Sequence, residues 1–131
     1  MTEKISTDDF VAISDHIGRY CWLVDRGDAD AWAALWTQDC VFVGAGPEPL
    51  VGHDALRGVV NTVVSTGMRH LFGNLSCDYL DDKDTVKARY YNFITTWKGG
   101  GAFFSMVLSE LTLVRDGQGW LISRNDSKIC E

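Results

Sequence analysis

One histidine and one aspartate stand where their side chains could carry out proton transfer. His70 falls in the middle of an apolar segment, MRHLFGNL. Read as a β-strand with a period of two, this segment places His70 on the same face as Met68, Phe72 and Asn74. Asp25, in WLVDRGD, lies in the last turn of an expected helix, where the helix dipole disfavours a carboxylate by about 0.3–1 kcal/mol. Both side chains therefore need specific partners.

Each residue also has a simpler interpretation, and spacing alone does not decide between the two. His70 could be a core histidine that hydrogen-bonds to a backbone carbonyl. Asp25 could be a solvated residue at a helix end, helped by its neighbour Arg26. If the two side chains meet, the carboxylate would fix the tautomer of the imidazole and raise the basicity of its other nitrogen. Such a pair is a general base able to remove a proton near neutral pH.

The rest of the chain offers no competing chemical motif. It has no recognisable Ser or Cys nucleophile motif, no His/Cys/Asp cluster with metal-ligand spacing and no Gly-rich phosphate loop. KGGGAF reads as a hairpin turn, because no Lys-Ser/Thr and helix follow it. The four cysteines lack C-x-x-C spacing, which favours reduced and partly buried thiols. We therefore expect proton transfer that uses no cofactor and no metal.

The composition is typical of one globular domain, which we expect to span residues 1–131. With 46% hydrophobic and 23% charged residues, the chain is too apolar for disorder and too often interrupted by polar residues for a membrane span. A net charge of −6 argues against binding to nucleic acid. MTEKISTDDF has no apolar segment of the secretory type. We therefore expect a cytoplasmic protein without nucleic-acid or membrane partners.

Hydrophobic spacing and turn residues predict the elements that position His70 and Asp25. Helices are expected where apolar residues recur every three or four positions, over residues 7–26, 28–36 and 54–66. Strands are expected at 40–46 and, separated by the turns DDKD, KGGG and DGQG, at 68–80, 84–98, 102–115 and 119–130. This order predicts an α+β fold, in which three N-terminal helices pack on a curved, mixed but mainly antiparallel sheet. Such a sheet, closed by helices, encloses a pocket.

These segments resemble the SnoaL-like branch of the nuclear transport factor 2-like superfamily. The resemblance covers about residues 8–127 and is carried by RYCWLVDRGDADAWAALWTQDCVFVG, VGHDALRGVV, MRHLFGNLSCDYLDDKDTVKARYY and LTLVRDGQGWLIS. It implies a cone-shaped, cystatin-like fold, with a curved sheet wrapped around a helix-lined pocket.

Within this branch the chain resembles the scytalone dehydratases and the hexachlorocyclohexane dehydrochlorinases, whose histidine base is supported by an aspartate at the end of the first helix. Asp25 and His70 match these catalytic residues, and Asn74 matches a polar position shortly after the histidine. The resemblance implies a cofactor-independent lyase, of the dehydratase or dehydrohalogenase kind, or an isomerase. The alternatives are a non-catalytic small-molecule-binding or assembly module, or the structural small subunit of an aromatic-ring dioxygenase.

The chain departs from these enzymes at other substrate-handling positions. A gapless count puts Thr95 at the second histidine of the dehydratases, Ser109 at their strand asparagine and Val24 at their leaving-group tyrosine. Tyr20 stands where the dehydrochlorinases carry a lysine. Its hydroxyl could donate a hydrogen bond to a leaving oxygen or an enolate.

If Thr95 faces the pocket, strand alternation brings its aromatic neighbours in with it. The expected substrate-binding residues are then Tyr20, Trp22, Phe72, Asn74, Tyr91, Phe93, Thr95, Trp97, Val107 and Ser109. Such a lining suits a small apolar or aromatic, ring-bearing molecule, although a core role is the better interpretation for Phe93.

The convex face of the expected sheet has no helix left to cover it. Met106, Leu108 and Val114 would form an apolar patch there, with Glu110 and Thr112 between them. Because monomers rarely expose large apolar patches, we expect a homodimer or homotrimer.

Overall fold

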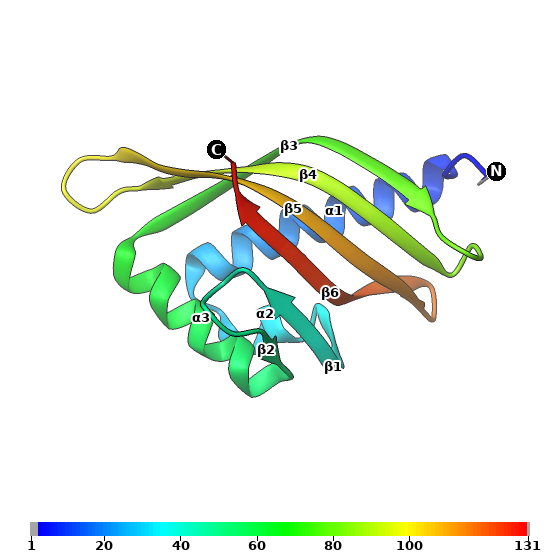
Figure 1. Cartoon of the computed structure of the whole chain (residues 1–131), viewed down its shortest axis with the longest axis horizontal. Helices are drawn as coiled ribbons and strands as arrows, with labels where there is room; N and C mark the ends of the chain where they lie inside the picture. The colour runs from blue at the N-terminus through cyan, green and yellow to red at the C-terminus, as the bar shows by residue number, and fades with distance from the viewer. Residues whose placement is uncertain (1–2, 131) are drawn as a thin grey trace.

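The structure is a computed structural model that describes residues 3–130. Its helices are α1 (Thr7–Arg26), α2 (Ala29–Ala33) and α3 (His53–Thr66), and its strands are β1 (Trp36–Val43), β2 (Leu50–Val51), β3 (Met68–Tyr79), β4 (Thr85–Thr96), β5 (Ala102–Asp116) and β6 (Gly119–Ile129). The strands form one sheet in the order β2-β1-β6-β5-β4-β3. Only the β1–β6 pair is parallel among these strands. The mainly antiparallel α+β fold is confirmed (Figure 1).

Helix α1 runs along the inner face of the curved sheet, and α2 and α3 lie near the end that carries β1 and β2 (Figure 1). The Ser6 side chain accepts a hydrogen bond from the backbone N–H of Asp9 at 3.1 Å and so caps the first turn. Gly27, with φ of 79°, ends the helix in the left-handed conformation. A buried stripe faces the sheet and consists of Ile13, Ile17, Tyr20, Cys21 and Val24. No described helix combines the length and apolar character needed to cross a bilayer.

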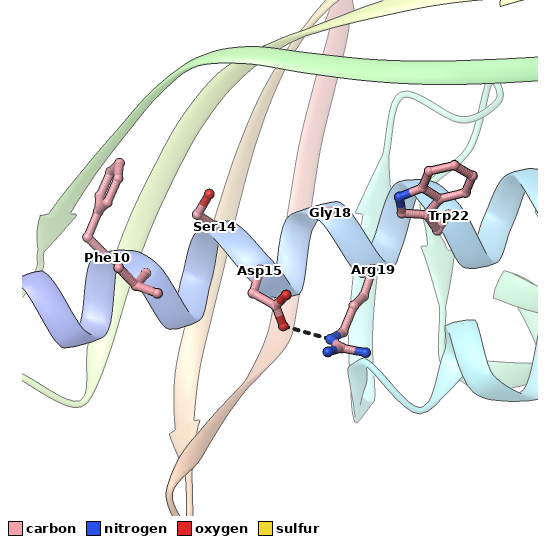
Figure 2. Close-up of a pocket in the computed structure, with 7 residues that line it drawn as sticks. Phe10, Ser14, Asp15, Gly18, Arg19 and Trp22 are labelled. Atoms are coloured by element: carbon pink, nitrogen blue, oxygen red, sulfur yellow. Dashed lines mark hydrogen bonds and ion pairs between the residues drawn. The ribbon is translucent and has the colours of Figure 1, made fainter.

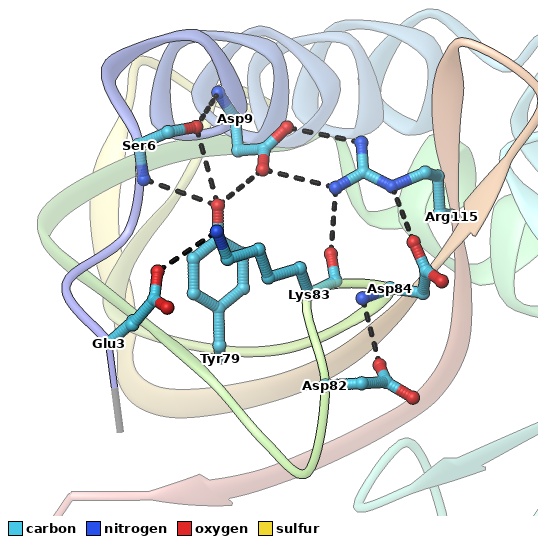
Figure 3. A network of polar contacts seen from close by, with 8 residues as sticks. All are labelled: Glu3, Ser6, Asp9, Tyr79, Asp82, Lys83, Asp84 and Arg115. Atoms are coloured by element: carbon cyan, nitrogen blue, oxygen red, sulfur yellow. Dashed lines mark hydrogen bonds and ion pairs between the residues drawn. The ribbon is translucent and has the colours of Figure 1, made fainter. Parts of the chain in front are cut away.

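A charged cluster, the N-terminal anchor, ties the start of α1 to the sheet and consists of Asp9, Tyr79, Asp84 and Arg115 (Figure 3). Asp9 accepts hydrogen bonds from both Arg115 Nη atoms at 3.2 and 3.1 Å and from the Tyr79 hydroxyl at 2.5 Å. Arg115 also donates to the Asp84 carboxylate and to the Lys83 carbonyl. The hydrogen bonds from Arg115 are the main reason why the pKa of Asp9 lies below its usual value. The anchor joins α1 to β3, to the β3–β4 turn and to β5.

A β-bulge divides β3 into two segments whose side chains alternate out of phase. The register shifts between Gly73 and Ser76, and Asn74 takes a left-handed backbone conformation with φ of 59°. Before the bulge His70 points inward, whereas after it the inward-facing residues include Cys77, which is buried. The bulge therefore allows both halves of one strand to contribute to the interior.

The N-terminal part of the sheet differs from the expectation. Helix α2 ends at Ala33, so that Trp36 begins β1 four positions before the expected strand. Strand β1 then pairs with β6, and β2, which was not expected, pairs with the other edge of β1. Tyr20, Trp32 and Trp36 pack their rings together at centroid distances of 5.2–5.9 Å. This aromatic cluster fixes the position of α1 beside β1.

Candidate active site

The Asp25 carboxylate binds His70 through both of its oxygens. Asp25 Oδ1 lies 2.5 Å from His70 Nδ1, and Asp25 Oδ2 accepts the backbone N–H of His70 at 2.9 Å. The side chains are only 8% and 10% exposed, respectively. Asp25 is therefore not a solvated helix end, and the partner of the His70 ring is a carboxylate rather than a backbone carbonyl.

This contact determines the tautomer of the neutral imidazole. Because a carboxylate can only accept a hydrogen bond, Nδ1 of His70 carries a hydrogen, and in the neutral ring Nε2 therefore holds the lone pair. Within residues 3–130 no group hydrogen-bonds to Nε2. The second bond, from the His70 backbone to Asp25, prevents the carboxylate from turning away. The pair thus presents a basic nitrogen in a fixed orientation.

His70 lies in the wall of a cavity of about 490 Å³ between the concave face of the sheet, α1 and α3. Most of the lining is apolar and includes Phe42, Val59, Met68, Ile94 and Val107. The polar side chains of the wall are Tyr20, Thr62, His70, Asn92, Ser105 and Ser127. Burial raises the pKa of Tyr20 well above its usual value, so its hydroxyl stays protonated and can act as a donor. Within the described chain, no three His, Cys, Asp or Glu side chains gather as a metal site requires.

A set of hydrogen-bonded polar side chains, the cavity network, connects Tyr20 on α1 to strands β4, β5 and β6. It consists of Asn92, Ser109, Ser127, Asn125 and Tyr20. The amide of Asn125 donates to the Tyr20 oxygen at 3.2 Å, and Ser127 donates to Asn125 Oδ1 at 2.7 Å. Ser109 lies 3.0 Å from Ser127, and Asn92 donates to Ser109 at 3.5 Å. Asn92, Ser109 and Asn125 are 4%, 0% and 1% exposed, and these hydrogen bonds pair most of their buried polar atoms, although Asn92 Oδ1 has no partner among the described residues.

The structure places some of the expected lining residues in the cavity. Tyr20 and Val107 line it, and Ser109 is buried in the cavity network. Phe72 instead packs its ring against Tyr90 at 5.7 Å and lines a smaller cavity of about 270 Å³ between α1 and β3. Phe72 thus lies on the expected face of the sheet, but it lines the smaller cavity, which Asp25 and His70 also border, rather than the larger one.

The prediction for β4 was wrong by one residue in phase. The gapless count put Thr95 inward, but the inner face carries Tyr90, Asn92 and Ile94. Asn92 pairs directly with Val107, and directly paired residues share a face of the sheet. The outer face of β4 therefore carries Tyr91, Phe93 and Thr95, which were expected inside, and Trp97 lies just after the end of the strand. Tyr91 and Trp97 are 44% and 60% exposed.

Trp22 and Asn74 also lie outside the cavity. Trp22 is 69% exposed and lines an open groove along the outer side of α1, beside Gly18 and the Asp15–Arg19 ion pair (Figure 2). Asn74 is exposed at the bulge of β3, where the change of phase turns it away from the face that carries His70. Neither residue lines the larger cavity as predicted, although Trp22 borders the smaller cavity beside Asp25 and His70.

Sequence reasoning did not find Asn92, Ser105, Asn125 or Ser127. Asn92 could have been found, because Lys87 and Arg89 are charged and share the phase of Tyr91, which marks that face of β4 as solvated. Asn125 and Ser127 alternate in LISRNDSKI, but the strand carries an irregularity in register near Leu113 of its partner. No simple alternation runs through it.

Comparison with known proteins identifies the class. The SnoaL-like domain family matches residues 6–126, and the chain belongs to this family. No curated protein sequence gives a significant match.

Solved structures with the same fold include an NTF2-like protein with a cystatin-like fold from Novosphingobium aromaticivorans, with 23% identity and a TM-score of 0.82 over 94% of this chain and 82% of that one. A candidate scytalone dehydratase from the same species has 17% identity and a TM-score of 0.78 over 93% and 84%. A protein from Catenulispora acidiphila in complex with S-DNPA has 22% identity and a TM-score of 0.77 over 92% of both chains. At these identities the likeness shows the fold.

Proposed function

We propose that the protein is a cofactor-independent lyase or isomerase, in which His70 removes a proton from a small ring-bearing substrate. The observation that carries this proposal is the 2.5 Å contact between Asp25 and His70 Nδ1, which leaves Nε2 free at the cavity wall. A lone buried imidazole is a poor base, because burial disfavours its charged form. The Asp25 carboxylate counteracts this effect by stabilising the imidazolium that forms.

The proposed reaction begins with transfer of a C–H proton of the substrate to His70 Nε2. The electrons of that C–H bond form a carbon–carbon double bond. In a lyase reaction, a hydroxyl or halide on the next carbon then leaves with the electrons of its own bond. In an isomerase reaction, a carbonyl oxygen takes up the charge as an enolate, and His70 returns the proton to another carbon. When a hydroxyl leaves or an enolate forms, the Tyr20 hydroxyl donates a hydrogen bond to the oxygen that gains charge.

The cavity indicates the kind of substrate. Its volume of about 490 Å³ is in the range of small-molecule sites, and its lining is mostly apolar with few polar groups. A small, mainly apolar, ring-bearing molecule fits these properties. The candidate scytalone dehydratase and the S-DNPA complex among the structural neighbours support a lyase or ligand-binding role for this fold.

The test is hydrogen exchange on carbon in D₂O, followed by NMR with a panel of cyclic ketones and cyclic β-hydroxyketones. A general base at Nε2 should exchange an acidic C–H of a bound ligand whether or not elimination follows. We expect His70→Ala to lower this exchange about 10²- to 10⁴-fold. The control His16→Gln removes a histidine that bonds to the Leu35 carbonyl, outside the cavity, and should retain the exchange. Equal exchange by wild type and His70→Ala would favour the alternative, a non-catalytic binding module.

An assembly role has its own support on the convex face of the sheet. Leu71, Tyr91 and Phe103 are 67%, 44% and 62% exposed, on the strands β3, β4 and β5. We propose that this face associates with further copies of the chain in a homodimer or homotrimer. Light scattering at micromolar concentration should give a mass well above 14.6 kDa, and a monomer mass would contradict this assembly.

A further inference from the structure

The hydrogen bonds of the cavity network all run in one donor-to-acceptor direction. This direction determines whether the Tyr20 hydroxyl can donate to a ligand. The Ser127 hydroxyl donates its only hydrogen to Asn125 Oδ1. In the 3.0 Å contact between the two serine hydroxyls, Ser109 must therefore be the donor to Ser127. Ser109 in turn accepts from the Asn92 amide. Every hydrogen in this series points from β4 towards Asn125 on β6.

At the end of the series, Asn125 supplies an N–H to the Tyr20 oxygen. The hydroxyl hydrogen of Tyr20 is then not used by the network. Within the described chain Tyr20 has no other hydrogen-bond partner, and its side chain lines the cavity. A hydroxyl that accepts from an amide is also a better donor, because hydrogen bonds in series polarise one another.

We infer that Asn125 and Ser127 are positioning residues, which hold Tyr20 as a vacant hydrogen-bond donor for an oxygen anion of the substrate. This inference rests on the proposed function for its role in catalysis, and it commits the substrate to carry an oxygen that gains negative charge opposite Tyr20. The network itself is built from neutral groups. It therefore directs the hydroxyl without placing a competing anion in the cavity.

A probe for this donor is 4-nitrophenolate, a flat ring that carries one oxygen anion. Its affinity can be measured by calorimetry at a pH where the probe is fully ionised. Burial raises the pKa of Tyr20, so the hydroxyl remains protonated under these conditions. We expect Tyr20→Phe to weaken binding about tenfold to a hundredfold, because a hydrogen bond to a charged group is lost. The ring contacts of Tyr20 with Trp32 and Trp36 are retained in this variant.

The positioning role is tested with Ser127→Ala. Without the Ser127 hydroxyl, the Asn125 amide can turn its oxygen towards Tyr20 and capture the hydroxyl hydrogen. We expect affinity for 4-nitrophenolate to fall several-fold, with recovery in Ser127→Thr, which keeps a hydroxyl. The matched control is Ser123→Ala on the same strand, whose hydroxyl donates to the Thr112 carbonyl, and it should bind as wild type does.

A double-mutant cycle separates the positioning role from direct contact, because Ser127 also lines the cavity. If Ser127 acts through Tyr20, Ser127→Ala causes no further loss in a Tyr20→Phe background. Additive losses would show that Ser127 contacts the probe itself or merely supports the fold. Unchanged affinity in Tyr20→Phe would show that the bonds run the other way, with Tyr20 donating to Asn125. Failure of wild type to bind the phenolate would also overturn the inference.

This experiment does not depend on turnover. Loss of the proposed function would appear as carbon exchange that His70→Ala does not change, with the binding pattern of the cycle intact. If the inference fails but the proposed function holds, carbon exchange will still depend on His70. The Tyr20 and Ser127 variants will then bind the phenolate as wild type does. The two failures are therefore distinguishable.

Discussion

Helix α1 carries Asp9 near its start and Asp25 near its end. The two sites differ in whether a hydrogen-bonding group remains unpaired. Asp9 shares its oxygens between Arg115 and Tyr79, and these partners are themselves bonded within the N-terminal anchor. Asp25 spends both oxygens on His70 alone. Within residues 3–130 the other nitrogen of that ring has no hydrogen-bond partner, and the ring lies at the cavity wall. We call the Asp9 end of α1 the closed end, because its hydrogen-bonding groups are paired with one another. We call the Asp25 end the open end, because it leaves one ring nitrogen unpaired among the described residues.

The helix dipole makes this difference more informative. Asp9 lies in the first turn, where a carboxylate is favoured, whereas Asp25 lies in the last turn, where it is disfavoured by about 0.3–1 kcal/mol. A carboxylate that served only to attach the helix would be better placed at the N-terminal end. The position of Asp25 is thus accounted for by its partner rather than by helix stability. The fully paired groups around Asp9 attach the helix to the sheet, whereas the Asp25–His70 pair keeps a nitrogen that can react.

The largest effect should come from making the same substitution at the two ends. Asp25→Asn should lower carbon exchange at least about a hundredfold, because an amide can reorient the ring or select the wrong tautomer. Asp9→Asn should leave exchange within about twofold of wild type and instead lower the denaturation midpoint. NMR exchange rates and urea titrations on both variants check the pair. Equal effects of the two substitutions on exchange would remove the distinction between the two ends.

The next effect concerns the stability of the closed end. Arg115→Ala removes the donors to Asp9, Asp84 and the Lys83 carbonyl, and it should cost about 2 kcal/mol in the free energy of unfolding. Arg57→Ala breaks exposed ion pairs with Asp30 and Asp54 and should lower the free energy of unfolding much less. Urea denaturation measures both values. Similar losses would mean that the N-terminal anchor is no stronger than a surface ion pair.

Acid should weaken the closed end in a predictable direction. The hydrogen bonds from Arg115 lower the pKa of Asp9 in the folded protein below its usual value. Asp9 therefore contributes stability above that value, and this contribution is lost as the pH falls through the folded-state pKa. The free energy of unfolding should decline more steeply in wild type than in Asp9→Asn below about pH 4. Parallel declines in the two proteins would contradict the assignment.

The smallest effect is expected at the bulge of β3. Asn74→Gly should change the free energy of unfolding by less than about 1 kcal/mol, because glycine adopts the observed positive φ without strain. Asn74→Ala should be less stable than Asn74→Gly, since alanine disfavours this conformation. Neither variant should change the affinity for 4-nitrophenolate, because Asn74 is exposed and outside the cavity. A tenfold change in affinity would place Asn74 in the site after all.

Much of the fold could be predicted, because its helices, strands and turns follow from short stretches of sequence. Apolar spacing predicted α1 over the residues that form it, and the turns at DDKD, KGGG and DGQG separate the four long strands. The two residues of the open end were also found, since a carboxylate in a last helical turn and a histidine in an apolar strand both require an explanation.

The rest of the site depends on features that strand alternation does not contain. The extra residue at Asn74 changes which side chains of β3 point inward, and a count along the sequence cannot include it. The phase of β4 was taken from a gapless comparison, although charges at Lys87 and Arg89 already marked the other face as solvated. Asn125 meets Tyr20 only through the sheet order, which joins distant parts of the chain.

Strand β6 also has a consequence for how the chain is synthesised. In the sheet order β2-β1-β6-β5-β4-β3, it is the one strand that joins β1 to the strands of the C-terminal half. Until residues 119–129 have left the ribosome, β1 has no strand partner except the two residues of β2, and the strand that carries Asn125 and Ser127 is missing. The cavity is therefore completed by a contact of large sequence separation, which requires the closure of a long loop and is slow. We expect β1 to gain protection last in pulsed hydrogen exchange during refolding, and earlier protection of β1 than of β4 would contradict this order of assembly.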